Sequence, residues 1–548
     1  MSAVRAVRHR FVGFATGVRH GYERGARGVE ASIKLVERRY TPLGRFTPGP
    51  FEGWRFLWRP AIVGFVALSA VLAGASFSNS PFKLNMVGTW FFGEPSGSGR
   101  PVLLSDPTVL FSIALVIGGL VLLMRVWLRL AEVVKYHPKA PVVALWGMFL
   151  LWSIPMIIAP PLFSRDVYSY AAQGEMTSHT VSPYLNGPGT LGSGPFVAPV
   201  DSLWLNTPAP YGPFFLFLDG SIAKLTGHHE LATVVGLRLL EVAAVVLLGF
   251  ALTSLARTRG RDPGEVLVLG IMNPVVLLSL IGGAHNDAAM AALLVAGVAM
   301  AARKRPVVAL FLCAAAAAIK APAALGILYV AWTWLGPNLR LREKWRPFAM
   351  ATVISATTLG VFSWLAGFGL GWIRNLATPG TVVSWTAPAT GVGMALSGLL
   401  HLIGIPVSTS IMINVTRILG FLGAVVYAGW LLINADRRGW IRSLALSLLL
   451  FVVLGPVIWP WYLVWGLALM AVSYVGREHF WLLLLSIISP FRCVTSFGPI
   501  GSALRHSGLG PIVLALALLA LLILYPLGGW TQWSRNPEPE LQAVAASY

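Results

Sequence analysis

The sequence predicts an all-α, polytopic membrane protein, and three observations lead to that fold class. Hydrophobic residues make up 56% of the 548 residues and charged residues only 11%, a balance that soluble domains do not have. Apolar runs of about 18 or more residues recur along the chain, and such runs form helices that cross a bilayer. The ten-residue alternation of a membrane β-barrel is absent.

The apolar runs predict about 12 to 14 membrane-spanning helices. We place spans near residues 60–79, 108–130, 141–162, 231–256, 265–283, 286–302, 346–366, 409–433, 440–457, 459–475, 479–495 and 509–528, with a broken pair of half-length helices over 307–336. The membrane domain therefore covers residues 60–528. It lies between a basic N-terminal tail (1–59) and a short C-terminal tail (529–548).

The positions of the basic residues predict the orientation in the membrane. The net charge is +20, and Lys and Arg gather in 1–59 and in the short loops 257–261, 303–305, 340–346 and 437–442. Such clusters mark cytoplasmic segments, so we expect a multi-pass plasma-membrane protein with both termini in the cytoplasm. This distribution explains the basic charge without a nucleic-acid partner, and the tail would lie on anionic membrane lipids.

Three long segments are exoplasmic in this topology: 80–107, 163–230 and 367–408. Apolar stretches within the last two, 212–226 and 386–403, are too short to cross a bilayer. They predict short helices that lie in the outer interface. Together the loops and helices would enclose a chamber at the outer membrane edge.

The most informative motif is SRDVYSY (164–170), at the start of the largest outer loop. A charge at the membrane edge is costly to desolvate, and the Asp166 carboxylate could accept a proton from an attacking sugar hydroxyl. Two structural alternatives remain open. Asp166 could pair with Arg165, or it could cap a helix over 167–176.

Aromatic residues accompany this motif and recur at a second outer turn, GPVIWPWY (455–462). The aromatic residues in question are Tyr168, Tyr170, Tyr184, Trp204 and Tyr211 in the loop, and Trp461 and Tyr462 in the turn. Aromatic faces and hydroxyl groups commonly bind sugars. The alternative is the aromatic belt that many membrane proteins have at the interface.

A second polar group lies in GGAHND (282–287), at the outer connection between two apolar runs. Polar side chains at this position cost free energy unless they bind a ligand or pair with other groups. The residues concerned are His285, Asn286 and Asp287. Either Asn286 or Asp287 caps the following helix, or the three residues bind hydroxyl groups of an acceptor. His285 is too isolated to predict a metal site, and no nucleotide-binding or metal-binding motif is found, so we expect neither a metal nor a cofactor.

Three cations lie within apolar runs: Arg238, Lys320 and Arg417. Glu241 follows Arg238 at i+3, which predicts a structural ion pair. Lys320, at the Pro-containing break of the half-length pair, has no partner at all in the sequence pattern, and Arg417 has no obvious local partner. The phosphate of a lipid carrier would supply an anion for them, for Arg165 at the membrane edge and for Arg238 as a further donor contact. Snorkelling to the surface is the alternative.

On these motifs the chain resembles the actinobacterial polyprenol-phosphate-mannose-dependent α-(1→6)-mannopyranosyltransferases of lipomannan synthesis. The matching segments, in order, are SRDVYSYAAQG (164–174), SPY (182–184), GGAHND (282–287), IKAPA (319–323) and PWYLVW (460–465). The family has type A and type B members and a GT-C fold, and the basic tail looks more like type B.

The resemblance implies an inverting transfer of mannose from polyprenyl-phosphate-mannose to a lipid-anchored mannan, on the exoplasmic face. It assigns the role of base to Asp166 and the neutralisation of the departing phosphate to Lys320 and Arg417. In many GT-C enzymes the first acidic loop follows the first span, whereas Asp166 follows the third predicted span. A transporter or flippase of lipid-linked saccharides and a ligase-type glycan transferase are the alternatives. The charged groups gather at the outer side, which favours an enzyme.

Overall fold

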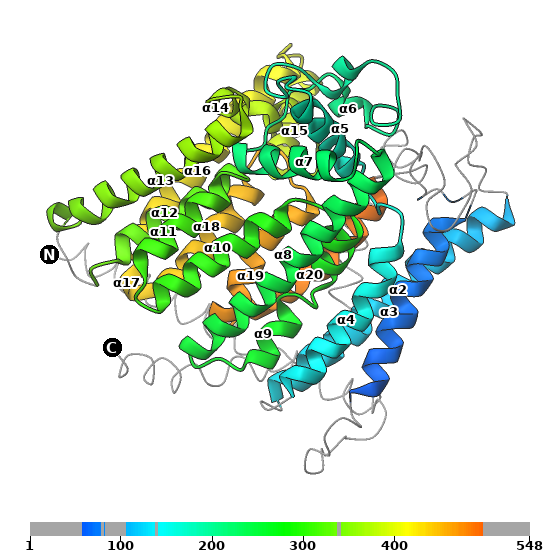
Figure 1. Cartoon of the computed structure of the whole chain (residues 1–548), viewed down its shortest axis with the longest axis horizontal. Coiled ribbons are helices and arrows are strands. Elements are labelled where there is room, and N and C mark those ends of the chain that lie inside the picture. Colours follow the sequence, from blue (N-terminus) through cyan, green and yellow to red (C-terminus); the bar gives the residue numbers. More distant parts are fainter. Residues whose placement is uncertain are drawn as a thin grey trace, which may run out of the picture. The chain divides into compact units, whose positions relative to one another are not determined.

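The computed structural model of the protein is helical, as the sequence predicts (Figure 1). It describes residues 57–77, 80, 82, 106–136, 141–336 and 341–496, and no residue in these ranges belongs to a strand. Nearly all of the basic tail, most of the outer loop 80–107, the predicted span 509–528 and the C-terminal tail lie outside the described residues.

The apolar helices follow the predicted spans closely. They are α2 (Trp58–Ser76), α3 (Pro107–Tyr136), α4 (Val142–Ile158), α8 (Glu230–Thr258), α9 (Pro263–Leu269), the π-helix η3 (Val276–Gly282), α10 (Asp287–Ala302), α11 (Pro306–Ala317), η4 (Ala321–Ala323), α12 (Ala324–Thr333), α13 (Trp345–Ala366), α16 (Thr409–Ile433), α18 (Trp440–Val453), η7 (Pro460–Leu463), α19 (Val464–Ser473) and α20 (Glu478–Ser496). Short helices at connections complete the set: η5 (Leu341–Glu343) and α17 (Ala435–Arg438).

Five of these helices, α2, α3, α8, α13 and α16, are long and apolar enough to cross a membrane. The pair η3 and α10 would add a sixth span, although its two halves are bent by 115°. Five further apolar helices of the described residues are shorter than 18 residues. The protein is thus an all-α polytopic membrane protein, and the larger number of about 12 to 14 spans stays a prediction.

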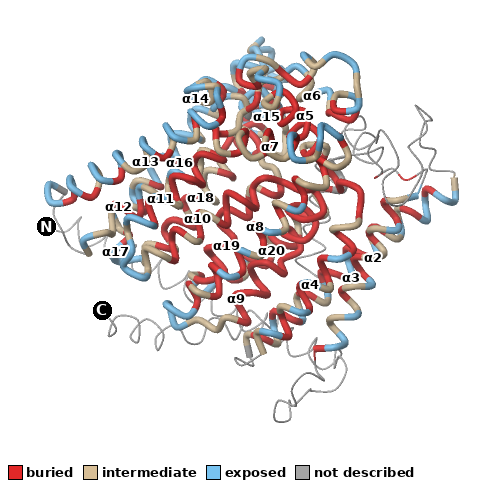
Figure 2. Tube along the Cα trace, viewed as in Figure 1, coloured by how far each residue is buried: buried red, intermediate tan, exposed pale blue. Residues whose placement is uncertain are grey.

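Burial differs strongly between helices (Figure 2). In α10 nearly every residue from Asp287 to Ala299 is buried, because its many small residues let neighbouring helices approach closely. A Cβ added at Gly297 would lie 2.9 Å from the Ala309 carbonyl oxygen of α11. In contrast α16 exposes large apolar side chains such as Leu419, a surface suited to lipid.

Regular helix is interrupted at two places within the apolar segments. The predicted break of the half-length pair is confirmed, since Lys320 has extended backbone (φ −149°, ψ 123°) between α11 and η4. The expectation of one continuous span over 265–283 is wrong, because α9 ends at Leu269 and η3 begins at Val276. Pro274 explains this interruption, since the residue before a proline is disfavoured in the α conformation.

The segments predicted to be exoplasmic form their own helices: α5 (Asp166–Ser178), η2 (Pro188–Leu191), α6 (Ser202–Leu205), α7 (Pro213–Leu225), α14 (Gly371–Arg374), η6 (Asn375–Thr381) and α15 (Pro388–Leu402). Helices are therefore present at both predicted positions, as α7 and α15, and their location in the membrane interface stays a prediction. In Figure 1 they lie at the same end of the helices as α5 and α6. The α5 and α7 backbones are in close approach, since a Cβ at Gly174 would lie 2.5 Å from the Asp219 carbonyl oxygen.

Candidate functional site

Asp166 is the first residue of α5, directly after the loop that leaves α4. Its backbone N–H donates to Ser164 Oγ (3.1 Å), and its carboxylate oxygen Oδ1 accepts from Trp204 Nε1 (3.1 Å) on α6. The helix N-cap is Arg165, and no side chain caps this end. The alternative in which Asp166 serves as an N-cap is therefore wrong, and its carboxylate is directed to other groups.

Asp166 is enclosed but still reachable, since 15% of its side chain is exposed. Burial raises the pKa of the Asp166 carboxyl to about 6, against the opposing effects of the Lys320 ammonium and of the Trp204 hydrogen bond. A carboxylate with a pKa close to neutral is suited to accepting a proton in a reaction.

Lys320 forms a buried ion pair with Asp287. Its Nζ donates to both carboxylate oxygens, at 2.8 Å and 2.9 Å, and lies 3.4 Å from Asn286 Oδ1. Trp465 Nε1 donates to Asp287 Oδ1 at 2.6 Å. The expectation that Lys320 has no partner is therefore wrong, because its partner comes from a turn more than thirty residues earlier in the chain.

Aromatic rings surround the Lys320 ammonium. The ring centre of Tyr462 is 4.4 Å from Nζ, and those of Tyr211 and Trp465 are each 5.6 Å away. Tyr170 contacts Tyr211 edge to face, with ring centres 5.2 Å apart. Such rings stabilise a cation through the negative face of each ring, and they exclude water from the ion pair.

The loop before α7 is hydrogen-bonded to the break at Lys320. Gly212 N donates to Ile319 O and Phe214 N donates to Ala318 O, both at 2.9 Å. Gly212 is required here, since a Cβ would lie 2.2 Å from the Ala318 carbonyl oxygen. This contact places Tyr211 against Lys320.

His285 connects the GGAHND turn to Asp166. Its Nδ1 lies 3.6 Å from Asp166 Oδ2, and its ring stacks on Trp461 with ring centres 3.6 Å apart. The preceding residue, Ala284, has a positive φ of 51°. A left-handed backbone at a residue other than glycine is strained, and such strain is concentrated at functional sites.

Arg238 forms hydrogen bonds with the backbone of the same region. Its guanidinium donates to the carbonyl oxygens of Ile157 (3.0 Å), Gly282 (2.9 Å) and Ala159. Glu241, with which the sequence predicts an ion pair, accepts from Ala289 N at 3.0 Å. Arg238 thus joins the segment before Asp166 to the GGAHND turn, which favours a structural role over its predicted contact with a donor.

Arg417 also donates hydrogen bonds mainly to backbone groups. Its guanidinium donates to Thr390 Oγ1 and to the carbonyl oxygens of Gly380, Val382 and Pro456, at 2.6 to 3.3 Å. These contacts hold α15 and the loop before it against α16.

Arg165 differs from the other three cations. Its side chain is half-buried beside Asp166, and within the described part of the chain it forms no hydrogen bond or ion pair. Its guanidinium thus has no protein partner among the described residues.

The remaining predicted tyrosines lie in different surroundings. Tyr170 belongs to the aromatic group around Lys320. Tyr168 is buried and interacts electrostatically with Glu230 and Arg238. Tyr184 packs in a separate hydrophobic cluster with Leu216 of α7. The structure thus brings together Asp166, Tyr170, His285, Asn286, Asp287, Lys320, Trp461 and Tyr462.

Two buried side chains are absent from the candidate residues: Trp465 at the site and Asp219 on α7. Trp465 follows Trp461 by four residues, a spacing that places both on one helix face, and that signal was available in the sequence. Asp219 of α7 is fully buried and has no side-chain hydrogen-bond partner among the described residues. Nothing in its local sequence indicated this.

Comparisons with known proteins agree with the motifs. Residues 62–336 match the family model described as "Alpha-(1->6)-mannopyranosyltransferase, N-terminal domain". Residues 389–526 match the "MptB C-terminal domain".

Named relatives match over most of the chain. Alpha-(1->6)-mannopyranosyltransferase A of Mycobacterium tuberculosis is 30% identical over 89% of this chain and 93% of its own length. A probable alpha-(1->6)-mannopyranosyltransferase of Mycolicibacterium smegmatis is 30% identical over 81% and 87%. Alpha-(1->6)-mannopyranosyltransferase B of Corynebacterium glutamicum is 30% identical over 71% and 68%. No solved structure matches the sequence.

Proposed function

Because the chain belongs to the α-(1→6)-mannopyranosyltransferase family, we propose that it transfers mannose in α-(1→6) linkage at the Asp166 site. The donor is polyprenyl-phosphate-mannose, and the acceptor is a mannan on a lipid anchor, in the synthesis of lipomannan and lipoarabinomannan. The fold that we propose for this reaction is of the GT-C type. The match to the MptB C-terminal domain supports type B, whereas relatives named A and B are equally identical to the chain.

The observation that supports this function best is the convergence of four separate motifs. Asp166, the GGAHND turn, the break at Lys320 and the turn with Trp461 lie far apart in sequence. Their polar groups nevertheless form one connected cluster. Clustered charges at one depth suit a reaction centre, whereas a transport path for saccharides needs polar groups through the membrane.

In the proposed reaction Asp166 acts as the base. An acceptor hydroxyl attacks the anomeric carbon of the donor mannose and gives its proton to the Asp166 carboxylate. The bond between that carbon and the phosphate oxygen breaks, and the polyprenyl phosphate leaves with the electron pair. A single displacement inverts the anomeric centre, so an α-linked product requires a β-linked donor.

Arg165 is the leading candidate for the donor phosphate, because its guanidinium has no partner among the described residues. Arg is suited to this role because its fork of N–H groups matches phosphate oxygens. Lys320 and Arg417 contribute less, since their donors already have partners. The Lys320 charge still lowers the energy of an anion that forms nearby.

Binding of the acceptor is assigned to the aromatic and polar groups around Asp166. Trp461 and Tyr462 contribute aromatic rings, and Asn286 offers an amide N–H that has no partner among the described residues. These are the kinds of group that bind sugar hydroxyls and sugar rings. We place this chamber on the exoplasmic side and both termini in the cytoplasm, because the basic loops lie at the opposite ends of the predicted spans.

Replacement of Asp166 by Asn tests the proposed base. Membranes that contain the variant, supplied with radiolabelled polyprenyl-phosphate-mannose and a mannan acceptor, should form less than about a hundredth of the wild-type product, because base catalysis contributes about 10²–10⁴-fold.

Asp201→Asn is the matched control. It makes the same change in the same outer loop, at the N-cap of α6, where Asn is an equally good cap. Wild-type transfer by the Asp166→Asn protein would refute the assignment, and loss of transfer in both variants would show a general effect of the substitutions. Translocation of a lipid-linked saccharide without any mannosyl transfer would favour a flippase.

A further inference from the structure

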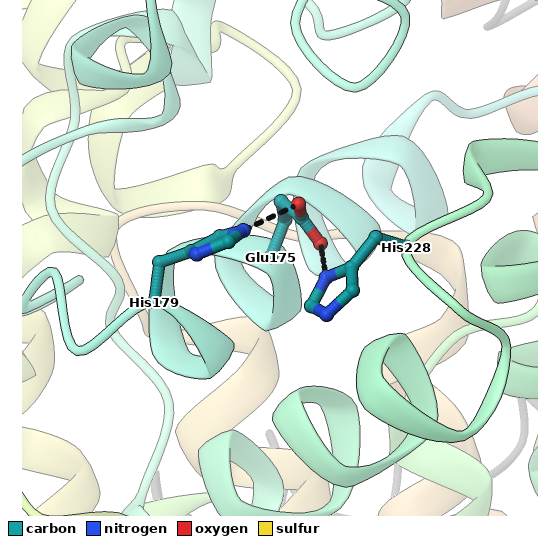
Figure 3. A group of neighbouring side chains, drawn as sticks. All are labelled: Glu175, His179 and His228. Carbon is teal, nitrogen blue, oxygen red and sulfur yellow. Dashed lines mark hydrogen bonds and ion pairs between the residues drawn. The ribbon is translucent and has the colours of Figure 1, made fainter.

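Outside the Asp166 site, a Glu and two His side chains meet at the far end of α5 (Figure 3). Glu175 and His179 are separated by one helical turn, and His228 comes from the turn between α7 and α8. One carboxylate oxygen of Glu175 lies 3.0 Å from His179 Nε2, and the other lies 2.8 Å from His228 Nδ1. The two imidazole rings are tilted by 32°, with centres 4.9 Å apart.

These spacings are close to those of a zinc site. Ligand atoms about 2.1 Å from a tetrahedral Zn²⁺ are separated from one another by about 3.4 Å. The three candidate ligand atoms all lie within 4.8 Å of one another. Small rotations of the two rings would therefore bring them into position around an ion.

The chemistry of the group also fits. Imidazole and carboxylate ligands suit zinc, and three protein ligands with an open fourth position are a common zinc arrangement. The His179 and His228 side chains are 56% and 42% exposed, whereas Glu175 is 12% exposed. An ion can thus reach the site from solvent, and a water molecule can complete its coordination.

We propose that Glu175, His179 and His228 form a binding site for Zn²⁺. The ion replaces the hydrogen bonds between the carboxylate and the two rings, so the facing ring nitrogens bind it in their neutral form. The site joins the last turn of α5 to the turn before α8. It therefore connects two outer elements that α7 separates in the sequence.

The position of the site indicates a structural role. Glu175 follows Asp166 by nine residues on the same helix, which corresponds to about 13 Å along its axis. The ion is consequently too far from Asp166 to take part in bond breaking. It fixes the helix that carries Asp166 in its first turn.

The test uses the purified full-length protein with any histidine tag removed and with metals stripped by a chelator. Titration with ZnCl₂ in a calorimeter should show one ion per chain, and Co²⁺ should produce the visible absorption of a coordinated ion. His179→Ala and His228→Ala should each weaken binding by at least about 100-fold, since loss of even an outer-shell partner costs 10–100-fold. The thermal midpoint should rise with Zn²⁺ in the wild type and not in these variants.

His401→Ala is the matched control, because His401 is exposed at the end of α15 and lies outside the cluster. It should bind Zn²⁺ as the wild type does. Absence of binding by the stripped wild type would overturn the proposal. Unchanged affinity in both His179→Ala and His228→Ala would do so too, since the ion would then lie elsewhere. Size-exclusion profiles of the metal-free variants verify that they remain folded.

Discussion

Asp166 combines two properties, enclosure by neighbouring side chains and access from outside. It is enclosed by Trp204 and His285, yet 15% of its side chain remains accessible. Enclosure makes the charged form less stable and so raises the pKa of the carboxyl to about 6. Access lets a substrate hydroxyl reach it.

The pKa of Asp166 predicts how mannosyl transfer depends on pH. Only the ionised carboxylate accepts a proton, so the transfer rate should fall as the pH drops through about 6. At pH 5 the rate should be roughly a tenth of its plateau. Initial rates measured between pH 4.5 and 8 at saturating donor would show this limb, and a flat profile across the range would contradict the assignment.

Asp219 is a second acidic residue with a perturbed environment. Burial raises the pKa of its carboxyl well above the usual value. The folded protein therefore binds this proton more tightly than the unfolded chain does, and stability falls as the pH rises from about 4 through the folded-state pKa. Each unit of increase in that pKa corresponds to about 1.4 kcal/mol.

The Asp219→Asn variant should lack this contribution. Its thermal midpoint should decline less than that of the wild type between pH 4.5 and pH 8, because Asn does not ionise. Unfolding of the purified proteins followed by intrinsic fluorescence provides the comparison. Parallel declines in the two proteins would show that folding does not raise the pKa of the Asp219 carboxyl.

Individual functional residues were predictable to different degrees. Asp166, Lys320 and Asp287 are recognisable in the sequence, because a charged side chain costs free energy in an apolar chain. Their pairing was not predictable, because the Lys320–Asp287 contact depends on how α10 packs against the break. Three hydrogen-bond partners of Arg238 are backbone carbonyl oxygens, which no side-chain pattern reveals.

At the scale of elements, the site depends on two breaks in apolar helices. The break at Lys320 was predictable, since Pro322 follows a polar residue inside a run too short for two full spans. The interruption of 265–283 was not expected from hydrophobicity, although Pro274 marks it. Apolar runs thus locate the helices, whereas local backbone preferences decide where those helices bend.

The loop before α7 packs closely against the break at Lys320. Gly212→Ala should force the loop away from Ala318, because the closest atoms are backbone and cannot rotate aside. Such overpacking typically destabilises a protein by about 1–3 kcal/mol. It should also move Tyr211 from Lys320, so transfer should fall at least about tenfold.

Gly194→Ala is the control for this change, since a Cβ at Gly194 meets nothing within 4 Å in the same outer loop. Thermal unfolding and mannosyl transfer of both variants are measured side by side. Equal behaviour of the two variants would show that the close approach at Gly212 has no consequence.

For the whole molecule, the sequence predicted the class of fold and the order of its helices. Composition and run length decide both, because a bilayer requires about 20 apolar residues for each spanning helix. The short outer helices α7 and α15 were also foreseen from apolar stretches too short to cross. The convergence of the four motifs was not predictable, since it depends on packing between helices far apart in sequence.

The central claim is that the cluster around Asp166 binds the lipid phosphate donor and transfers its sugar. A cryo-EM structure of the Asp166→Asn protein with polyprenyl-phosphate-mannose tests it most directly. We predict that the phosphate contacts Arg165, and that the mannose contacts residue 166. A phosphate bound at Arg417 or at the cytoplasmic ends of the helices, with the cluster empty, would contradict the claim.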